Sequence, residues 1–257
     1  MTKVLILAPH PDDEVIGAGG LIQRSGDAHV VFITAGENNP WPQRVMRRTW
    51  RITDSGRAEW AAMRRREALA SLEVLGAPAE CATFLDFPDG RLAELARRGD
   101  ARLLDALRSL IERFRPSLIV APSARDLHPD HRAASWYAHQ AARSEIVTYV
   151  VHGDGAPDRL QFSLRLTDDE RERKRRAIEC HASQLLLSRR RFLSYALPRE
   201  DFFRAEFDLV GIESRARERA RRVRHACFAL FGARSAGKQT AADVEDGAGD
   251  VPGVLRG

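Results

Sequence analysis

Short apolar runs that alternate with amphipathic stretches constrain the fold of this sequence more than any other feature. Five runs are apolar almost throughout and are expected strands: 3–8, 29–34, 83–85, 117–121 and 146–151. Strands buried on both faces of a parallel sheet have this composition. Helical periodicity marks three stretches between them: 58–75, 103–114 and 132–142. The alternation predicts an α/β fold, a Rossmann-like, doubly wound, mostly parallel sheet with helices on both faces.

The 257 residues are enough for one substantial core, so we expect a single domain over residues 1–232. An arginine-rich helix is expected at 212–231, and a disordered tail at 233–257, which lacks apolar periodicity. No apolar run reaches the roughly 20 residues of a membrane helix, and no cleavable signal is recognisable. Three cysteines far apart in the chain argue against a disulfide scaffold and against a thiolate metal site. These features predict a cytoplasmic protein.

The formal net charge of +5 is modest, but arginines crowd four segments: 44–66, 171–176, 189–191 and 215–224. Such runs attract nucleic acid, phosphates or acidic lipids, although solvated helix faces are the favoured interpretation. Residues 213–231 combine a basic stretch with an apolar end, which also suits contact with an anionic membrane. Packing of this segment on the domain is favoured over that contact.

A dense polar motif, His10-Pro11-Asp12-Asp13-Glu14, follows the first expected strand directly. One histidine and three carboxylates within five positions repel one another unless a cation offsets their charge. Zinc accepts imidazole nitrogen and carboxylate oxygen, so His10 and one aspartate supply two suitable ligands. The acidic residues would equally suit the first turn of a helix, so this motif alone leaves both interpretations open.

A second motif, His128-Pro129-Asp130-His131, comes shortly after the expected strand at 117–121. Its two histidines can complete a metal site and still leave one imidazole free. If the strands are parallel, both motifs lie at the same edge of the sheet, where ligands bind in such folds. Together the two motifs predict a metal centre.

These motifs resemble the two signatures of the LmbE/PIG-L family of N-acetylglucosamine-type deacetylases. The likeness extends to three other places and covers residues 3–185: Gly36-Glu37, Arg64-x-x-Glu67 and His181-x-Ser183-Gln184. The resemblance implies a metal-dependent hydrolase that removes an N-acetyl group from an amino sugar or a sugar-containing metabolite. A glycolipid, a thiol precursor, an antibiotic or a polysaccharide intermediate would be such a substrate.

The same resemblance implies roles for particular residues. It gives three ligands to Zn2+, or to another divalent ion in its place: His10, Asp13 and His131. It makes Asp12 the general base and His128 the support of the oxyanion, with Asp130 orienting His128 and keeping it charged. The metal would polarise the carbonyl and acidify a water, and Asp12 would take the proton.

Three residues are candidate substrate contacts. Arg64 matches a family position that contacts the substrate, but it sits in a run of three arginines. Asp89 could accept sugar hydroxyls, although Pro88-Asp89-Gly90 also describes an ordinary turn, which we favour slightly. Trp41, in the polar segment 36–57, could stack on a sugar ring.

Other functions compete with an amino-sugar deacetylase. A zinc amidase acting on a non-sugar amide would use the same residues. An arginine-rich nucleic-acid-binding protein is less favoured, because basic character alone is only an electrostatic footprint. A catalytically silent metal-binding scaffold is less favoured, because every implied catalytic position is filled. We therefore expect a small N-acetylated substrate and no nucleic-acid partner; peripheral membrane contact stays open as the less favoured alternative, and the oligomeric state is left open.

Overall fold

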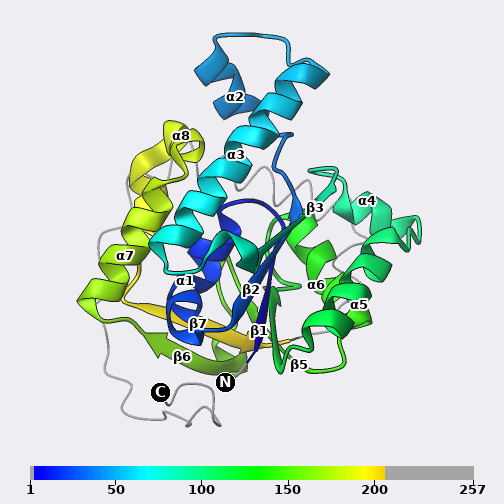
Figure 1. Ribbon diagram of the computed structural model, residues 1–257, viewed down its shortest axis with the longest axis vertical. Coiled ribbons are helices and arrows are strands. Elements are labelled where there is room, and N and C mark those ends of the chain that lie inside the picture. The colour runs from blue at the N-terminus through cyan, green and yellow to red at the C-terminus, as the bar shows by residue number, and fades with distance from the viewer. Residues whose placement is uncertain (1–2, 206–257) are drawn as a thin grey trace.

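The computed structural model describes residues 3–205, whose strands form a single seven-stranded sheet in the order β3-β2-β1-β4-β5-β7-β6 (Figure 1). In chain order the strands are β1 Val4–Ala8, β2 Ala28–Thr34, β3 Ala82–Phe87, β4 Leu118–Pro122, β5 Glu145–Tyr149, β6 Leu160–Arg165 and β7 Arg199–Arg204. Strands β1 to β5 pair in parallel, and β7 pairs antiparallel with β5 and β6. The predicted α/β class is confirmed.

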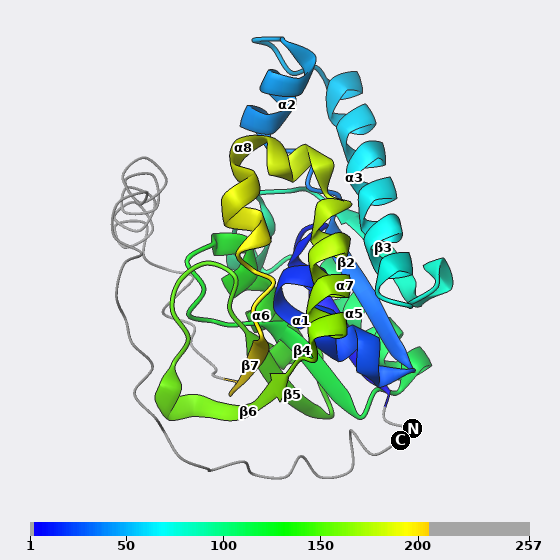
Figure 2. The ribbon, with the colours of Figure 1, turned by 90° about the vertical axis from the view of Figure 1, so that its left-hand side faces the viewer.

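Helices cover both faces of this sheet. They are α1 Asp13–Ser25, α2 Pro40–Arg47, α3 Asp54–Val74, α4 Leu92–Arg97, α5 Arg102–Phe114, α6 Pro129–Ala141, α7 Asp168–Glu179 and α8 Ala182–Leu193. Two short 3-10 turns complete the described elements: Ala79–Cys81 and Pro157–Arg159. Figures 1 and 2 show α1, α3 and α7 on one side of the sheet and α4, α5 and α6 on the other. Within residues 3–205, no helix is both long and apolar enough to cross a membrane.

The core has two halves because side chains of a strand alternate between the faces of a sheet. Val4 and Ile6 of β1 join the cluster beneath α1, α3 and α7. Leu5 and Leu7, between and after them, join the cluster beneath α5 and α6. All four side chains are fully buried, as the continuous apolar run predicts for a central strand.

The main differences from the expected elements lie outside the parallel core. Helix α1 begins at Asp13, so Asp13 and Glu14 stand in a first helical turn, which the sequence had left open as one interpretation of the first motif. Helix α2 lies in the polar segment 36–57, for which no helix was predicted; Pro40 stands at its first position and pre-sets the backbone for a helix. Strands β6 and β7 were not expected, and their sequences include charged residues because the sheet ends there. The predicted segments 212–231 and 233–257 lie outside the described residues.

Strand β1 lies between β2 and β4, so the chain leaves it in opposite directions along the sheet. At such a switch point the loops that follow the two central strands diverge and border a crevice. The first polar motif follows β1 and the second follows β4. The fold therefore brings two distant parts of the sequence to one crevice.

Helix α1 is interrupted in its middle, where Ala18 has φ −145° and ψ 21°. Buried side chains satisfy the backbone groups released there. Glu200 accepts hydrogen bonds from the amides of Gly20 at 2.7 Å and Leu21 at 3.2 Å. Lys174 donates to the Ile16 carbonyl at 2.8 Å and to Glu200 at 2.6 Å. This buried pair ties α1 to α7 and β7.

Candidate metal centre and active site

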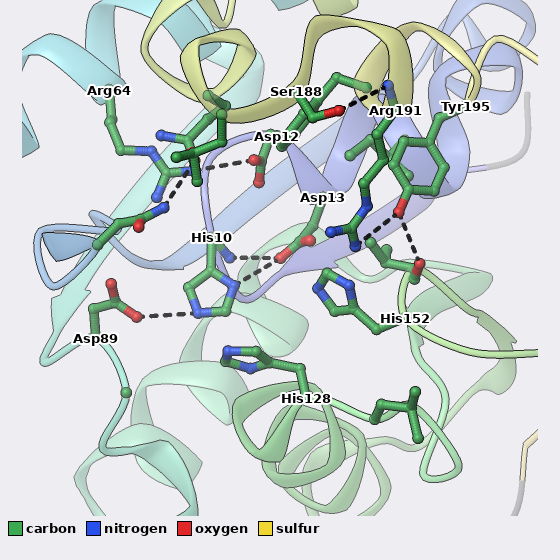
Figure 3. A pocket seen from close by; sticks show the side chains of 18 of the residues that line it. His10, Asp12, Asp13, Arg64, Asp89, His128, His152, Ser188, Arg191 and Tyr195 are labelled. Carbon is green, nitrogen blue, oxygen red and sulfur yellow. Dashed lines mark hydrogen bonds and ion pairs between the residues drawn. The ribbon is translucent and has the colours of Figure 1, made fainter. Parts of the chain in front are cut away.

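Three side chains from two distant segments of the chain converge where β1 and β4 end. His10 Nδ1 lies 3.0 Å from Asp13 Oδ2, and His131 Nε2 lies 3.1 Å from the same oxygen. Asp13 opens α1 and His131 stands in the first turn of α6, so two helices fix their directions. All three residues are buried. Figure 3 shows His10 and Asp13 pointing toward one another. The structure thus brings together the three predicted ligands.

This cluster fits a divalent cation. Asp13 Oδ2 lies within 3.1 Å of a ring nitrogen of both His10 and His131. The His128 ring is also near, because one ligand atom from each of His10, His128 and His131 lies within 4.8 Å of the others. Neither ring nitrogen of His131 makes a hydrogen bond of normal geometry within the described residues, although the ring is fully buried. Burial alone would lower the pKa of His131, but the carboxylates of Asp126 and Asp13 raise it to about 10. The site therefore attracts positive charge, and two imidazoles with one carboxylate are typical zinc ligands.

Asp12 stands beside the cluster in a strained conformation. Its φ of 128° is rare for a residue with a side chain. Its amide donates to Glu14 Oε2 at 2.9 Å, and its own Oδ2 lies 3.2 Å from Nη2 of Arg64. Burial raises the pKa of Asp12 to about 6, although the Arg64 cation opposes the rise. Burial thus gives the Asp12 carboxylate a proton affinity suited to base catalysis, and Arg64 holds it at the site.

Arg64 is itself held by the backbone. Its Nη1 donates to the Gly36 carbonyl at 3.2 Å, and its Nη2 donates to the Pro11 carbonyl. Gly36 has φ 64°, and a Cβ there would lie 1.8 Å from Arg64 Nη1, so only glycine leaves room for the guanidinium. Figure 3 shows Arg64 directed toward Asp12. The candidate substrate contact Arg64 therefore lines the site, but its visible task is to position Asp12.

A cavity of about 500 Å³ opens beside Asp12 and Asp13. One wall is α8, which contributes Leu187 and Arg191, and Tyr195 follows shortly after the helix ends. Tyr195 accepts a hydrogen bond of 3.5 Å from Arg191, on the side of the cavity away from His10 in Figure 3. The cavity combines a charged floor with a partly apolar wall, as small-molecule sites do.

The sequence that forms this site matches a known protein family. The family described as PIG-L, GlcNAc-PI de-N-acetylase, matches residues 5–142, which are more than half of the 257 residues. The chain belongs to this family. The matched range contains both polar motifs and the strands that precede them, and the prediction of a deacetylase-type enzyme is confirmed at the level of the family.

Individual relatives differ in their reactions. A 1D-myo-inositol 2-acetamido-2-deoxy-alpha-D-glucopyranoside deacetylase from Corynebacterium efficiens is 28% identical over 235 residues, covering 72% of this chain and 73% of the relative. A 4-oxalmesaconate hydratase from Pseudomonas putida is 29% identical over 144 residues, covering 54% of this chain and 51% of the hydratase. The solved N,N'-diacetylchitobiose deacetylase from Pyrococcus horikoshii has a TM-score of 0.57 and 26% identity, covering 78% of this chain and 82% of that one.

The PIG-L resemblance implied that Asp130 orients His128 and keeps it charged, and the hydrogen bonds of this structure contradict that role. The Asp130 carboxylate accepts hydrogen bonds from the amides of Gly90 at 2.7 Å and Leu92 at 3.1 Å, not from His128. The Asp130 backbone amide instead donates to Nδ1 of His128 at 3.2 Å. Burial and the neighbouring His10 ring lower the pKa of His128 well below its usual range. Because Nδ1 accepts that amide hydrogen it carries no proton, so His128 is a neutral imidazole at a helix N-terminus, where positive charge is unfavourable.

Asp126 is a site residue that the sequence analysis did not identify. Asp126 is fully buried, and its Oδ2 lies 3.2 Å from Nδ1 of His131. It also accepts hydrogen bonds from three backbone amides: His128 at 2.8 Å, Val151 at 2.9 Å and His152 at 3.0 Å. A carboxylate behind a metal-binding histidine fixes the orientation of the ring. The one signal in the sequence is that Asp126 shortly precedes the second motif.

The two remaining candidate substrate contacts have different outcomes. Asp89 lines the cavity, where its Oδ1 lies 3.1 Å from His10 Nε2 and its Oδ2 accepts from the Asn38 amide at 2.9 Å. Burial alone would raise the pKa of Asp89, but the His10 ring brings it to about 2. Trp41 is 61% exposed, stands outside the cavity wall and has Arg44 5.5 Å from its ring. The structure places Asp89 at the site and Trp41 away from it.

Proposed function

We propose that this chain is a zinc-dependent hydrolase that removes the acetyl group from the nitrogen of an amino sugar or a sugar-containing metabolite. One observation carries the proposal: His10, Asp13 and His131 converge beside the Asp12 carboxylate at a cavity of about 500 Å³. Two of the relatives are, by name, deacetylases of N-acetylated sugars, which supports an amino-sugar substrate.

The chemistry divides between the cation and the chain. Bound by His10, Asp13 and His131, a divalent cation would supply Lewis acidity for the acetyl carbonyl and acidify a water molecule. In the reaction the water oxygen forms a bond to the acetyl carbon. The bond between that carbon and the nitrogen breaks, and acetate and a free amine leave. Proton movements in both steps fall to the side chains.

Asp12 is the base in this scheme. Because Arg64 lies against Oδ2 of Asp12, Oδ1 is the oxygen left to receive the proton of the attacking water. The same carboxyl group then passes that proton to the departing nitrogen, because an unprotonated nitrogen would have to depart as an anion and is a poor leaving group. The buried Arg64 keeps the carboxylate directed at the cavity through both transfers.

His128 stabilises the negative charge that develops on the carbonyl oxygen. Its Nδ1 accepts the Asp130 amide hydrogen, so the imidazole carries its proton on Nε2 and can donate it in a hydrogen bond. A positioned donor of this kind contributes about 3 kcal/mol of transition-state stabilisation. The hydrogen bond requires no charge on His128, in contrast to the role that the sequence suggested.

The two neighbouring aspartates provide the test. Asp12→Asn should keep the metal and lower kcat by about 10²–10⁴-fold, since it removes only the base. Asp13→Asn should lose the metal, because it removes a ligand. Metal content is measured by atomic absorption, and acetate release is measured on a panel of N-acetylated sugars and simple acetamides. Metal loss in Asp12→Asn with turnover intact in Asp13→Asn would reverse the two roles. Acetate release from simple amides alone would favour the amidase.

A hydratase is the second candidate, because one relative of 29% identity carries that name. A hydratase adds water across a carbon–carbon double bond and releases no acetate. The deacetylase is preferred because its Corynebacterium relative matches 72% of the chain, against 54% for the hydratase. Loss of ultraviolet absorbance from an unsaturated carboxylic acid, without acetate release from any sugar, would reverse this preference.

A further inference from the structure

Large apolar side chains are exposed mainly at one end of the molecule. Six of the eight in the described part of the chain belong to two short segments: Trp41, Val45, Met46, Trp50, Leu186 and Leu187. Trp50 is the most open, at 85% exposure. Both views of the ribbon place α2, the connection to α3 and α8 together at this end (Figures 1 and 2). Exposed apolar groups gathered in this way usually mark a contact surface.

We call the surface formed by residues 38–53 and α8 the α2–α8 surface. The two segments pack against each other, and Asn39 donates to Gln184 at 2.9 Å across them. They carry seven arginines and no aspartate or glutamate: Arg44, Arg47, Arg48, Arg51, Arg189, Arg190 and Arg191. Arg47 and Arg189 pair with glutamates from neighbouring elements. Within residues 3–205, Arg48, Arg51 and Arg190 form no ion pair, so the surface keeps a positive charge.

The α2–α8 surface borders the active-site cavity. Asn39, Leu187 and Arg191 belong to both the surface and the cavity wall. Leu187 is 53% exposed, so its side chain lies partly in the cavity wall and partly in solvent. A partner seated on this surface would therefore face the mouth of the cavity.

We propose that the α2–α8 surface docks on an anionic lipid bilayer. Tryptophan and arginine are the residues that settle at the level of lipid headgroups, and aliphatic side chains can enter the acyl region beneath. Each unpaired arginine near an anionic leaflet adds to the attraction. This surface lies within the described residues and is separate from the segment 213–231, on which the sequence first suggested membrane contact.

Other partners fit these observations less well. Nucleic acid would use the arginines and tryptophans, but Val45, Leu186 and Leu187 offer no ring on which a base can stack. In a two-fold dimer the same patch meets itself, so Arg48, Arg51 and Arg190 would face the same arginines of the second copy, and this surface carries no carboxylate of its own to offset them. Of these three partners, a lipid surface is the one that uses both the aliphatic and the cationic groups.

Vesicle binding of the full chain tests the proposal. The protein is sedimented with vesicles of neutral phosphatidylcholine and of phosphatidylcholine mixed with anionic phosphatidylglycerol. We expect binding to the anionic vesicles alone, weakened by added salt. Val45→Ser with Trp50→Ser should lower the partition coefficient about tenfold or more, since two apolar anchors are lost. Arg48→Gln with Arg51→Gln should lower it about fivefold per arginine.

Matched controls separate this surface from the rest of the molecule. Leu160→Ser removes an exposed leucine of β6, at the opposite end from α2 in Figure 1. Arg97→Gln with Arg108→Gln removes two charges from α4 and α5. Both controls should bind vesicles as the wild type does. Acyl chains brominated near the headgroup should quench the emission of the wild type, and Trp50→Phe should lose part of that quenching. Unchanged thermal midpoints show that each variant is folded.

Several results would overturn the proposal. One is a wild type that ignores anionic vesicles. Another is equal vesicle binding by the wild type and both surface variants, which would place the contact elsewhere, residues 206–257 included. A third is nucleic-acid binding or self-association that the surface variants abolish while vesicle binding is absent. None of these readouts depends on deacetylation, so the docking and the proposed function can fail separately.

Discussion

Two groups of buried charged side chains touch helix α1, and they differ in how completely their polar atoms are paired. At the middle of the helix, Lys174 and Glu200 bind each other and three backbone groups, and neither leaves a side-chain nitrogen or oxygen without a hydrogen bond. At the first turn, buried atoms of Glu14, His131 and His181 make no hydrogen bond of normal geometry within the described residues.

The difference teaches how to separate a structural network from a functional one. Buried polar groups are costly unless they are satisfied, so a completed network can stabilise the interruption of α1 without any ligand. An incomplete network persists in a folded protein when a ligand supplies the missing partner. In this molecule the incomplete group lies behind the cavity wall, where Glu14 contacts Asp12 and His131 contacts Asp13, and both aspartates line the cavity. The predictions that follow treat the middle of α1 as structural and its first turn as functional.

The largest expected effect is on the structural network. Lys174→Met leaves the Glu200 carboxylate buried without its cation and should lower the free energy of unfolding by about 3–5 kcal/mol. Urea unfolding followed by circular dichroism measures this loss. Metal content should not change. Arg175→Met, which removes two surface ion pairs from the same helix, is the control and should cost far less. Equal losses in the two variants would remove the distinction between the networks.

Metal removal tests the functional network. At free metal about 100 times Kd, binding stabilises the folded state by about 2.7 kcal/mol, so chelation should lower the thermal midpoint of the wild type. Asp13→Asn should show no such response, because the ligand shared by His10 and His131 is gone. Lys174→Met should keep the full response at its own lower midpoint. A chelator response that survives in Asp13→Asn would mean that the ion binds elsewhere.

The carboxylate behind His131 sharpens the comparison. Asp126→Asn should weaken metal affinity about tenfold to hundredfold, because the neutral amide holds the ring less firmly and lowers its basicity. Competition with a fluorescent chelator measures the affinity directly and needs no turnover. Asp105→Asn, an exposed carboxylate of α5, is the control. If Asp126→Asn binds metal as tightly as the wild type, Asp126 serves the backbone amides alone.

Local patterns in the sequence predicted the parallel core and the meeting of the two polar motifs for a physical reason. A strand buried on both faces must be apolar throughout, so β1, β2 and β4 can be recognised from their sequences alone. The ends of parallel strands share one edge of the sheet, so the two motifs could be brought together before any coordinates were known. The expected ligands are separated by more than a hundred residues, yet the topology alone predicts their meeting.

What escaped prediction depends on contacts between distant residues. Strands β6 and β7 pair with each other across a long connection, and their half-exposed sequences carry no continuous apolar run. His152 reaches the cavity only because β5 neighbours β4. The Asp130 carboxylate accepts hydrogen bonds from the amides of Gly90 and Leu92, and this pairing depends on how the segment between β3 and α4 lies against α6. A sequence motif identifies the residues of a site, but their hydrogen-bond partners depend on tertiary packing, which the motif does not contain.

The smallest expected effect concerns a third set of charged contacts of α1, an ion pair at the exposed C-terminal end of the helix. Arg24 in the last turn of α1 binds Glu170, and this bond lowers the pKa of Glu170 from 4.5 to about 2. The carboxylate form is thus favoured in the folded state, so its contribution to stability is present above pH 4.5 and is lost as the pH falls toward 2. Glu170→Gln should be slightly less stable than the wild type at neutral pH, and the gap should close on acidification. Urea unfolding at a series of pH values measures that gap, with Glu112→Gln on α5 as the control. A gap that stays constant with pH would mean that Glu170 acts through the hydrogen bonds of its helix cap, which glutamine can partly keep, and not through its charge.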